Sequence, residues 1–362
     1  MFTKERSTAM KGIAIAAMLF HHCFFTSKIY SGYVVNFFPL SEYLVNNIAV
    51  FGKFCVGTFA FVSGYGLTLK WEQSAAKGDN LSRFFLSRYI QTMSGFWFIY
   101  PLCLLFCHLM DGRTAAVYIG SNTISTAWQY LLSFLGVARL MGTPNLIYEW
   151  WYLSAAVIFI LLVPLFCQMT KKLGGTASLL LVVLIPRLLG MEFAGGTHPF
   201  SFLMPTALGV VACRTDFFVR IRQLFSPFAC QTCGRAVLFA FALLGMVVAY
   251  FLYRKLPFEQ YWELKYGLVP LIVILCCSET VLTSPLTLRI FGYLGRHSMN
   301  MYLLHMLFLT YFKVFLFHGR HFLVSFALLL AGSLALSILV EWLKKCLRWQ
   351  ALTQWLLSRI LG

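Results

Sequence analysis

The sequence predicts an all-α, polytopic membrane protein with about ten transmembrane helices and both termini in the cytoplasm. The 362 residues are 60% hydrophobic and only 11% charged, whereas soluble domains carry about 25% charged residues. Apolar residues gather in long runs, and about 20 of them in succession cross a bilayer. Most of the 29 Lys and Arg fall in segments that this layout places in the cytoplasm, which is the usual charge bias. This composition excludes a soluble enzyme, a secreted disulfide-bonded domain and a disordered chain.

Ten apolar runs define the predicted spans. The first, Gly12 to Ser27, follows basic residues as a signal peptide does, but two histidines interrupt it and no small-residue cleavage site follows. We therefore expect it to remain as the first span, with the N-terminus in the cytoplasm. The later runs lie near 48–69, 91–110, 150–170, 176–191, 201–213, 236–253, 266–282, 299–317 and 322–343.

Two other segments complete the predicted organisation. The stretch from Asp111 to Glu149 is expected outside the membrane, and residues 126–137 within it have the composition of a re-entrant or interfacial helix. Residues 344–362 alternate Trp and Leu with Lys and Arg, which predicts a cytoplasmic amphipathic tail helix on the inner membrane face. Residues 1–343 are expected to form one transmembrane domain, because no repeat or linker divides them.

The net charge of +17 does not indicate a nucleic-acid partner. The basic residues lie in short loops between apolar runs, where membrane topology accounts for them, so the expected surroundings are membrane lipids. Most of the 11 cysteines fall inside apolar runs and act as small hydrophobic residues. Cys230 and Cys233 form a CxxC pair without a second pair of ligands, so no metal site is expected.

Lys11, His21 and His22 are ionisable residues within the first predicted span, and such residues are functional candidates. Lys11 and His22 are separated by about 1100° of helical rotation and about 16 Å of rise, so they share one face. This arrangement places a cation at the cytoplasmic end of a stripe and an imidazole near the middle of the membrane. His21 points about 100° away from the stripe. The alternative is that both histidines only hydrogen-bond to neighbouring helices.

Two further candidates lie at the cytoplasmic ends of spans. Arg88 can bind a phosphate through two parallel hydrogen bonds, although snorkelling towards lipid headgroups explains the same position. Ser63 lies in a small-residue motif with Gly64. Small residues of this kind allow either close packing of helices or passage of a ligand along the backbone.

Other candidates lie within the ninth predicted span or at the outer ends of spans. Ser298, Tyr302 and His305 are spaced i, i+4 and i+7, so they share a helix face that is expected to look into the bundle. Interhelical hydrogen bonding explains this face as well as catalysis does. Glu149 and Asp111 are carboxylates at the outer ends of spans, where they are candidates for contact with an acceptor.

These segments, in this order, resemble the acyltransferase 3 family of integral membrane acyltransferases. The family's first span carries a basic residue, ten residues and then a histidine, which Lys11 and His22 match. The chain also departs from the family, because Lys11 replaces the usual Arg, Ala156 stands where many members have Glu, and Gln91 stands where a second basic residue is frequent. The other matching segments are Phe61 to Tyr65, Arg83 to Arg88, Trp151 to Pro164, and Leu294 to His305.

The resemblance implies an integral membrane O-acyltransferase, most often an O-acetyltransferase. Such an enzyme moves an acyl group from cytoplasmic acetyl-CoA, without a metal, to a hydroxyl of an extracytoplasmic or lipid-linked glycan in a bacterial cytoplasmic membrane. His22 is then the candidate general base or covalent relay. The remaining expected site residues are His305 in catalysis, Lys11, Arg88 and Ser63 towards the donor, and Glu149, Tyr302 and Asp111 towards the acceptor.

Two other classes of function fit the same residues. Buried histidines and small-residue motifs also suit a transporter or a small-molecule binding domain. The membrane half of some serine racemases resembles this family and is thought to handle the amino acid itself. A structural scaffold is the third class, and it would tolerate loss of His22.

Overall fold

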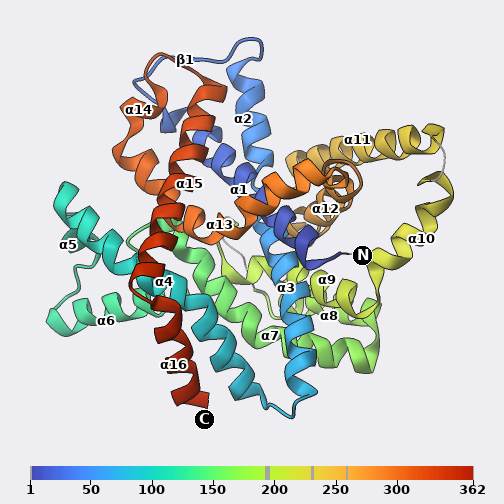
Figure 1. The fold of residues 1–362 in the computed structure, drawn as a ribbon, viewed down its shortest axis with the longest axis horizontal. Coiled ribbons are helices and arrows are strands. Elements are labelled where there is room, and N and C mark those ends of the chain that lie inside the picture. Colours follow the sequence, from blue (N-terminus) through green and yellow to red (C-terminus); the bar gives the residue numbers. More distant parts are fainter. Residues whose placement is uncertain (1, 192–195, 230–231, 258–259, 362) are drawn as a thin grey trace.

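The computed structural model describes residues 2–191, 196–229, 232–257 and 260–361, most of which lie in helices (Figure 1). Five short helical segments are η1 (Ser27–Ile29), η2 (Tyr148–Trp150), η3 (Pro199–Phe202), η4 (Leu264–Leu268, a π-helix) and η5 (Val281–Thr283). The α-helices are α1 (Lys4–Phe24), α2 (Glu42–Phe51), α3 (Phe54–Ala75), α4 (Leu81–Asp111), α5 (Arg113–Val117), α6 (Thr123–Phe134), α7 (Trp151–Leu173), α8 (Gly175–Leu188), α9 (Leu203–Arg214), α10 (Phe217–Ala229), α11 (Thr232–Lys255), α12 (Val269–Glu279), α13 (Pro285–Tyr311), α14 (Lys313–Phe317), α15 (Phe322–Cys346) and α16 (Trp349–Leu361).

The chain is an almost entirely helical, multi-pass membrane protein, but the expected count of about ten spans is not confirmed. Among the described residues, five helical segments are long and apolar enough to cross a bilayer, or six if a pair bent by 72° is one span. Helices α1 and α13 lie outside this set, since both carry several charged or histidine side chains. α1 packs against α2, α3, α12, α13 and α15. A helix covered by other helices can keep polar side chains that lipid would not accept.

Side chains at the helix ends explain where several helices begin and stop. The Thr3 hydroxyl accepts a hydrogen bond from the Arg6 amide at the start of α1. The side chains of Ser41 and Asn80 cap α2 and α4 in the same way, which satisfies amides that lack a partner within the helix. α4 ends at Gly112, whose left-handed φ of 66° is costly for other residues.

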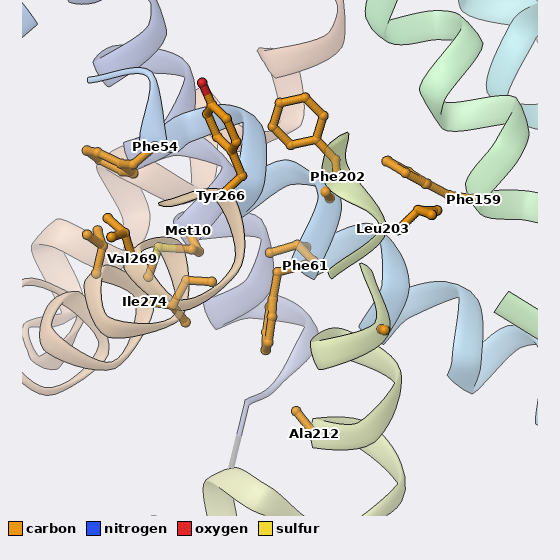
Figure 2. Packing of buried hydrophobic residues seen from close by; sticks show 14 of the residues in the cluster. Met10, Phe54, Phe61, Phe159, Phe202, Leu203, Ala212, Tyr266, Val269 and Ile274 are labelled. Carbon is orange, nitrogen blue, oxygen red and sulfur yellow. The ribbon is translucent and has the colours of Figure 1, made fainter. Parts of the chain in front are cut away.

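A buried core holds the centre of the bundle together. Figure 2 shows Met10, Phe61, Phe202 and Val269 converging from α1, α3, the end of η3 and α12. All four side chains are fully buried. Because these helices are far apart in the sequence, this core fixes which of their faces turn towards one another.

Two helix pairs approach so closely that their backbones touch. A Cβ atom on Gly12 of α1 would lie 1.9 Å from the Phe291 carbonyl oxygen of α13, and one on Gly295 would lie 1.8 Å from the Thr8 carbonyl oxygen. In α3, a Cβ on Gly64 would lie 2.2 Å from the Thr206 carbonyl oxygen of α9. Glycine is therefore required at these contacts, as is common where membrane helices pack tightly. The small-residue motif around Gly64 thus serves close helix packing.

A polar network also joins α13 to α15. The Lys344 ammonium donates to Glu341 Oε1 at 2.8 Å and to Asn300 Oδ1 at 3.2 Å. Asn300 Nδ2 donates to the same Glu341 oxygen at 2.8 Å. Lys344 is only 8% exposed, so the carboxylate and the amide compensate most of its loss of hydration.

The peripheral segments add short connections. β1 (Val35–Asn36) pairs in parallel with β2 (Arg320–His321), which ties the loop after α1 to the start of α15. The segment that is predicted to contain an interfacial helix holds α6. α16 packs against α4, where Trp349 Nε1 donates to the Ser94 carbonyl oxygen at 3.0 Å.

Candidate active site

A cavity of about 840 Å³ lies between α1, α3, η2, α7, η4 and α13. Its size is that of a small-molecule or cofactor site. Five of the eight expected site residues line it together, namely Lys11, His22, Ser63, Glu149 and Tyr302. The shared face that helical spacing predicts for Lys11 and His22 therefore looks into one space.

His22 meets a second histidine at this cavity. The centroids of the His22 and His305 rings are 4.9 Å apart. His305 is fully buried behind the wall, and its Nδ1 donates to the Tyr302 carbonyl oxygen at 2.8 Å. Since a carbonyl oxygen only accepts, Nδ1 carries the proton in the neutral ring and Nε2 keeps its lone pair. That Nε2 is buried and has no hydrogen-bond partner among the described residues.

The backbone contacts of α1 with α13 explain why the two rings come together. Gly12 and Gly295 leave no side chain between the helices, and the two helices lie against one another (Figure 1). His22 lies about three turns beyond Gly12, and His305 about three turns beyond Gly295. The histidine pair therefore depends on glycine contacts that are remote from it in both helices.

His21 also lines the cavity, although helical rotation places it about 100° from His22. Its Nδ1 donates to the Ala49 carbonyl oxygen of α2 at 2.7 Å. The His21 and His22 ring centroids are 5.0 Å apart. The backbone hydrogen bond holds His21 in one orientation, which is the structural role that the sequence leaves open for it.

Two hydrogen bonds fasten η2 to α13. The Tyr302 hydroxyl donates to the Glu149 carbonyl oxygen at 2.6 Å, and Trp150 Nε1 donates to the Leu303 carbonyl oxygen at 3.1 Å. Trp150 is almost fully buried. These contacts hold Glu149 at the wall of the cavity, so Tyr302 both lines the cavity and positions its neighbour.

The structure does not bring Arg88 to this cavity. Arg88 lines a separate hollow of about 280 Å³ together with Lys70, Lys77 and Arg83. Thr92, one helical turn further along α4, does line the main cavity. The pairing of Arg88 with Lys11 around one ligand, which the sequence predicts, therefore requires a ligand long enough to reach both spaces.

Asp111 also lies away from the main cavity. It ends α4, where its carboxylate accepts from the Arg113 amide at 3.0 Å and pairs with the Arg113 guanidinium at 3.3 Å. This local pairing gives Asp111 a role at the helix end. Its expected place on the acceptor side therefore has no support from the cavity geometry.

Sequence reasoning missed two lysines that line the cavity, Lys53 and Lys265. Lys53 lies between α2 and α3 inside an apolar stretch of 34 residues that is long enough to span a membrane. A cation within the apolar part of such a stretch is a functional candidate by the argument used for Lys11, so the signal was present in the sequence. Lys265 lies in the π-helix η4. It is not inside an apolar stretch of that kind, so the sequence did not mark it as a functional candidate.

The described residues contain no group of three or more His, Cys, Asp or Glu side chains placed to hold a metal ion. Cys230 lies outside the described residues, and so does the side chain of Cys233, so the structure says nothing of the CxxC pair. The arrangement as a whole is a helical membrane bundle with a large cavity, a histidine pair and basic side chains.

The sequence of this membrane protein matches the model of one protein family. The model of the acyltransferase 3 family, described as an acyltransferase domain, matches residues 6–342, so the chain belongs to that family. No curated protein and no solved structure matches the chain. Ala156, which stands where the family resemblance implies a frequent Glu, lines the cavity. This wall of the cavity therefore carries a methyl group where the resemblance implies a carboxylate.

Proposed function

We propose that this protein is an O-acyltransferase that moves an acetyl group from cytoplasmic acetyl-CoA to a hydroxyl of an extracytoplasmic or lipid-linked glycan. The observation that carries the proposal is the His22–His305 pair, with ring centroids 4.9 Å apart at a cavity that Lys11 also lines. Membership of the acyltransferase 3 family supports acyl transfer in general. The acetyl group, the glycan and the bacterial cytoplasmic membrane are parts of the proposal.

In the proposed donor site, CoA enters from the side of the membrane on which α1 begins. The Lys11 ammonium attracts a phosphate, and Ser63 lines the path of the pantetheine arm along the same cavity. The basic hollow around Arg88 takes a more distant phosphate of the nucleotide end. This division suits a long donor, because its nucleotide and its thioester occupy separate places.

In the proposed reaction, His22 acts as a general base. Its free ring nitrogen takes the proton of the acceptor hydroxyl while the hydroxyl oxygen attacks the thioester carbonyl carbon. The C–S bond breaks, CoA leaves as a thiolate, and the proton on His22 returns to that thiolate. The products are an O-acetyl ester and CoA with a free thiol. In this proposal His305 orients the His22 ring and stabilises the imidazolium that forms.

The acceptor is proposed to enter beside η2. Glu149 and Tyr302 line the cavity there, and a carboxylate and a phenol can hydrogen-bond to sugar hydroxyls. In this proposal donor and acceptor meet at one histidine, so a single site serves substrates from the two sides of the membrane.

The test is binding of acetyl-CoA to the purified protein in detergent, followed by transfer in membranes. Lys11→Ala and Arg88→Ala are expected to weaken binding by about tenfold each, because a hydrogen bond to a charged group contributes about 1.5–3 kcal/mol. His22→Ala is expected to retain binding and to lose transfer by about 10²–10⁴-fold. Lys345→Ala is the control, since Lys345 is exposed and does not line the cavity. No acetyl-CoA binding by folded wild-type protein would overturn the proposal and favour a carrier.

A further inference from the structure

A polar hollow lies beside the part of α4 that follows Arg88, and it is separate from the main cavity. It has a volume of about 480 Å³ and is enclosed by α4, α15 and α16. Figure 1 shows α16 alongside α4, and the two helices are in contact. Three glutamine side chains line it, so it is named the amide hollow here: Gln91 from α4, and Gln350 and Gln354 from α16.

One polar face of α4 leads from the hollow around Arg88 to the amide hollow. Ser87, Gln91 and Ser94 are spaced i, i+4 and i+7, so they share that face. Ser87 lines the hollow around Arg88, whereas Gln91 and Ser94 line the amide hollow. The Ser87 hydroxyl oxygen accepts from Arg88 Nη2 at 3.3 Å and from Gln91 Nε2 at 3.4 Å. The two hollows are therefore neighbours, about one helical turn apart along α4.

Gly95 keeps the α4 wall of the amide hollow open. Among the described residues, a Cβ atom on Gly95 would meet only the Lys344 ammonium, at 3.7 Å, which is an ordinary van der Waals distance. Helix packing therefore does not require glycine at this position, although glycine destabilises the interior of a helix relative to alanine. The missing side chain leaves room for a ligand against the helix.

An indole ring is fixed in the wall of the same hollow. Trp349 lines the hollow, and its Nε1 donates to the Ser94 carbonyl oxygen at 3.0 Å. Its ring packs edge-on against Phe98, with ring centroids 5.2 Å apart. Both contacts hold the indole in one orientation. An aromatic side chain held in this way can stack with the flat ring of a nucleobase.

The other groups in the wall can hydrogen-bond to the edge of such a ring. Lys344 is 8% exposed, and its described hydrogen bonds go to Glu341 and Asn300. An ammonium has three hydrogens, so one of them is left for a ring nitrogen. A glutamine amide offers both a donor and an acceptor, which is the combination that pairs with the edge of an adenine.

We propose that the amide hollow binds the adenine of the acyl donor while the hollow around Arg88 binds a phosphate on the same nucleotide. This inference rests on the proposed function, because it takes the donor to be acetyl-CoA. In CoA the adenine and the 3′-phosphate are attached to one ribose, so two neighbouring hollows can take them together. The pantetheine arm then passes Thr92, which lies on the adjoining face of α4 and lines the main cavity. α16 thus forms part of the donor site.

The first experiment measures binding of acetyl-CoA and of adenosine 3′,5′-bisphosphate, its nucleotide end, to the purified full chain in detergent. Gly95→Leu fills the amide hollow and should weaken binding of both by about tenfold or more, because stacking and hydrogen bonding of the base are lost. Gln354→Leu removes one amide from exposed α16 and should weaken both by about two- to tenfold. Gly66→Leu is the matched control and should bind as the wild type does. Gly66 does not line the hollow, and a Cβ on it meets nothing within 4 Å.

A shortened donor separates loss of adenine binding from damage to α4. S-acetyl-pantetheine carries the thioester but lacks the nucleotide. In membranes that contain the natural acceptor, Gly95→Leu should raise KM for acetyl-CoA by about tenfold with little change in kcat. It should leave transfer from S-acetyl-pantetheine at the wild-type rate. An equal loss with both donors would overturn the proposal, because the substitution would then act through the position of α4 and not through the base.

The binding results also separate this inference from the acyltransferase reaction. Equal affinity for acetyl-CoA in the wild type, Gly95→Leu and Gln354→Leu would refute the adenine site and leave the reaction standing, as expected if a lipid headgroup filled the hollow. Binding of the bisphosphate that Gly95→Leu weakens, in a protein that binds no acetyl-CoA, would refute the reaction and leave the nucleotide site standing. Binding of neither ligand by folded wild-type protein would refute both. Size-exclusion profiles and unfolding midpoints confirm that each variant is folded.

Discussion

The close contact of α1 with α13 predicts that Gly295→Ala lowers both the stability and the activity of the protein. A Cβ at this position would lie 1.8 Å from the Thr8 carbonyl oxygen and 3.1 Å from the Gly12 amide nitrogen. Real Cβ atoms essentially never come within 3.0 Å of such atoms, so α1 and α13 must move apart by about 1.2 Å at this point. Both atoms belong to the backbone of a helix, and neither can rotate away as a flexible side chain would.

Two measurable losses follow from this displacement. Forcing an extra methyl group into a packed contact costs about 1–3 kcal/mol, so the free energy of unfolding in a mixed-detergent titration should fall by that amount. A shift of about 1 Å in a reacting group can cost about 10²-fold in rate. Release of CoA thiol in membranes that contain the natural acceptor should therefore fall by up to that factor, because His22 and His305 are held by the same two helices.

Gly292→Ala is the matched control. It lies one turn before Gly295 on α13, and a Cβ there would meet nothing within 4 Å. The control should be as stable as the wild type or slightly more stable, since Ala favours a helix over Gly by about 1 kcal/mol. If Gly295→Ala had the same free energy of unfolding and the same rate of CoA release as Gly292→Ala, the backbone contact would not hold the histidine pair and the reasoning would fail.

Three other predictions follow from contacts of the described residues. Gly64→Ala should lower the unfolding midpoint markedly while Gly66→Ala does not, because a Cβ on Gly64 meets the backbone of α9 at 2.2 Å and one on Gly66 meets nothing within 4 Å. Tyr302→Phe removes the hydroxyl that donates to η2, so it should cost about 0.5–1.5 kcal/mol in the same titration; no loss would mean that η2 is held by other contacts. Lys344→Met leaves a carboxylate and an amide without their buried cation and should cost about 1–3 kcal/mol; an unchanged midpoint would show that water replaces the ammonium there.

Most of the secondary structure could be predicted from the apolar runs, because a membrane segment must satisfy its backbone hydrogen bonds within its own helix. The number of spans could not be predicted in the same way. α8 covers only 14 residues, and the paired α9 and α10 are bent by 72° at Thr215 to Asp216. A run of apolar residues shows that a segment is buried away from water. It does not show whether lipid or other helices of the protein surround that segment.

The site was partly predictable for a related reason. Lys11 and His22 are on one helix, so their common face follows from helical rotation alone, and both line the cavity. Arg88 and Asp111 looked equally suitable by residue type, yet α4 carries them to a second hollow and to a local ion pair. Lys265 joined the cavity from an element whose sequence showed no pattern of a site.

The sequence by itself determined that this chain is a helical membrane protein of the acyltransferase 3 family, because bilayer insertion and motif order depend on composition and spacing along the chain. It also determined the stripe of Lys11 and His22 on one helix. Only the tertiary structure decided that His305 meets His22 and that Lys53 and Lys265 share their cavity. These contacts depend on which helix faces meet. Backbone contacts at glycines such as Gly295 set those faces, and no spacing within a single helix specifies them.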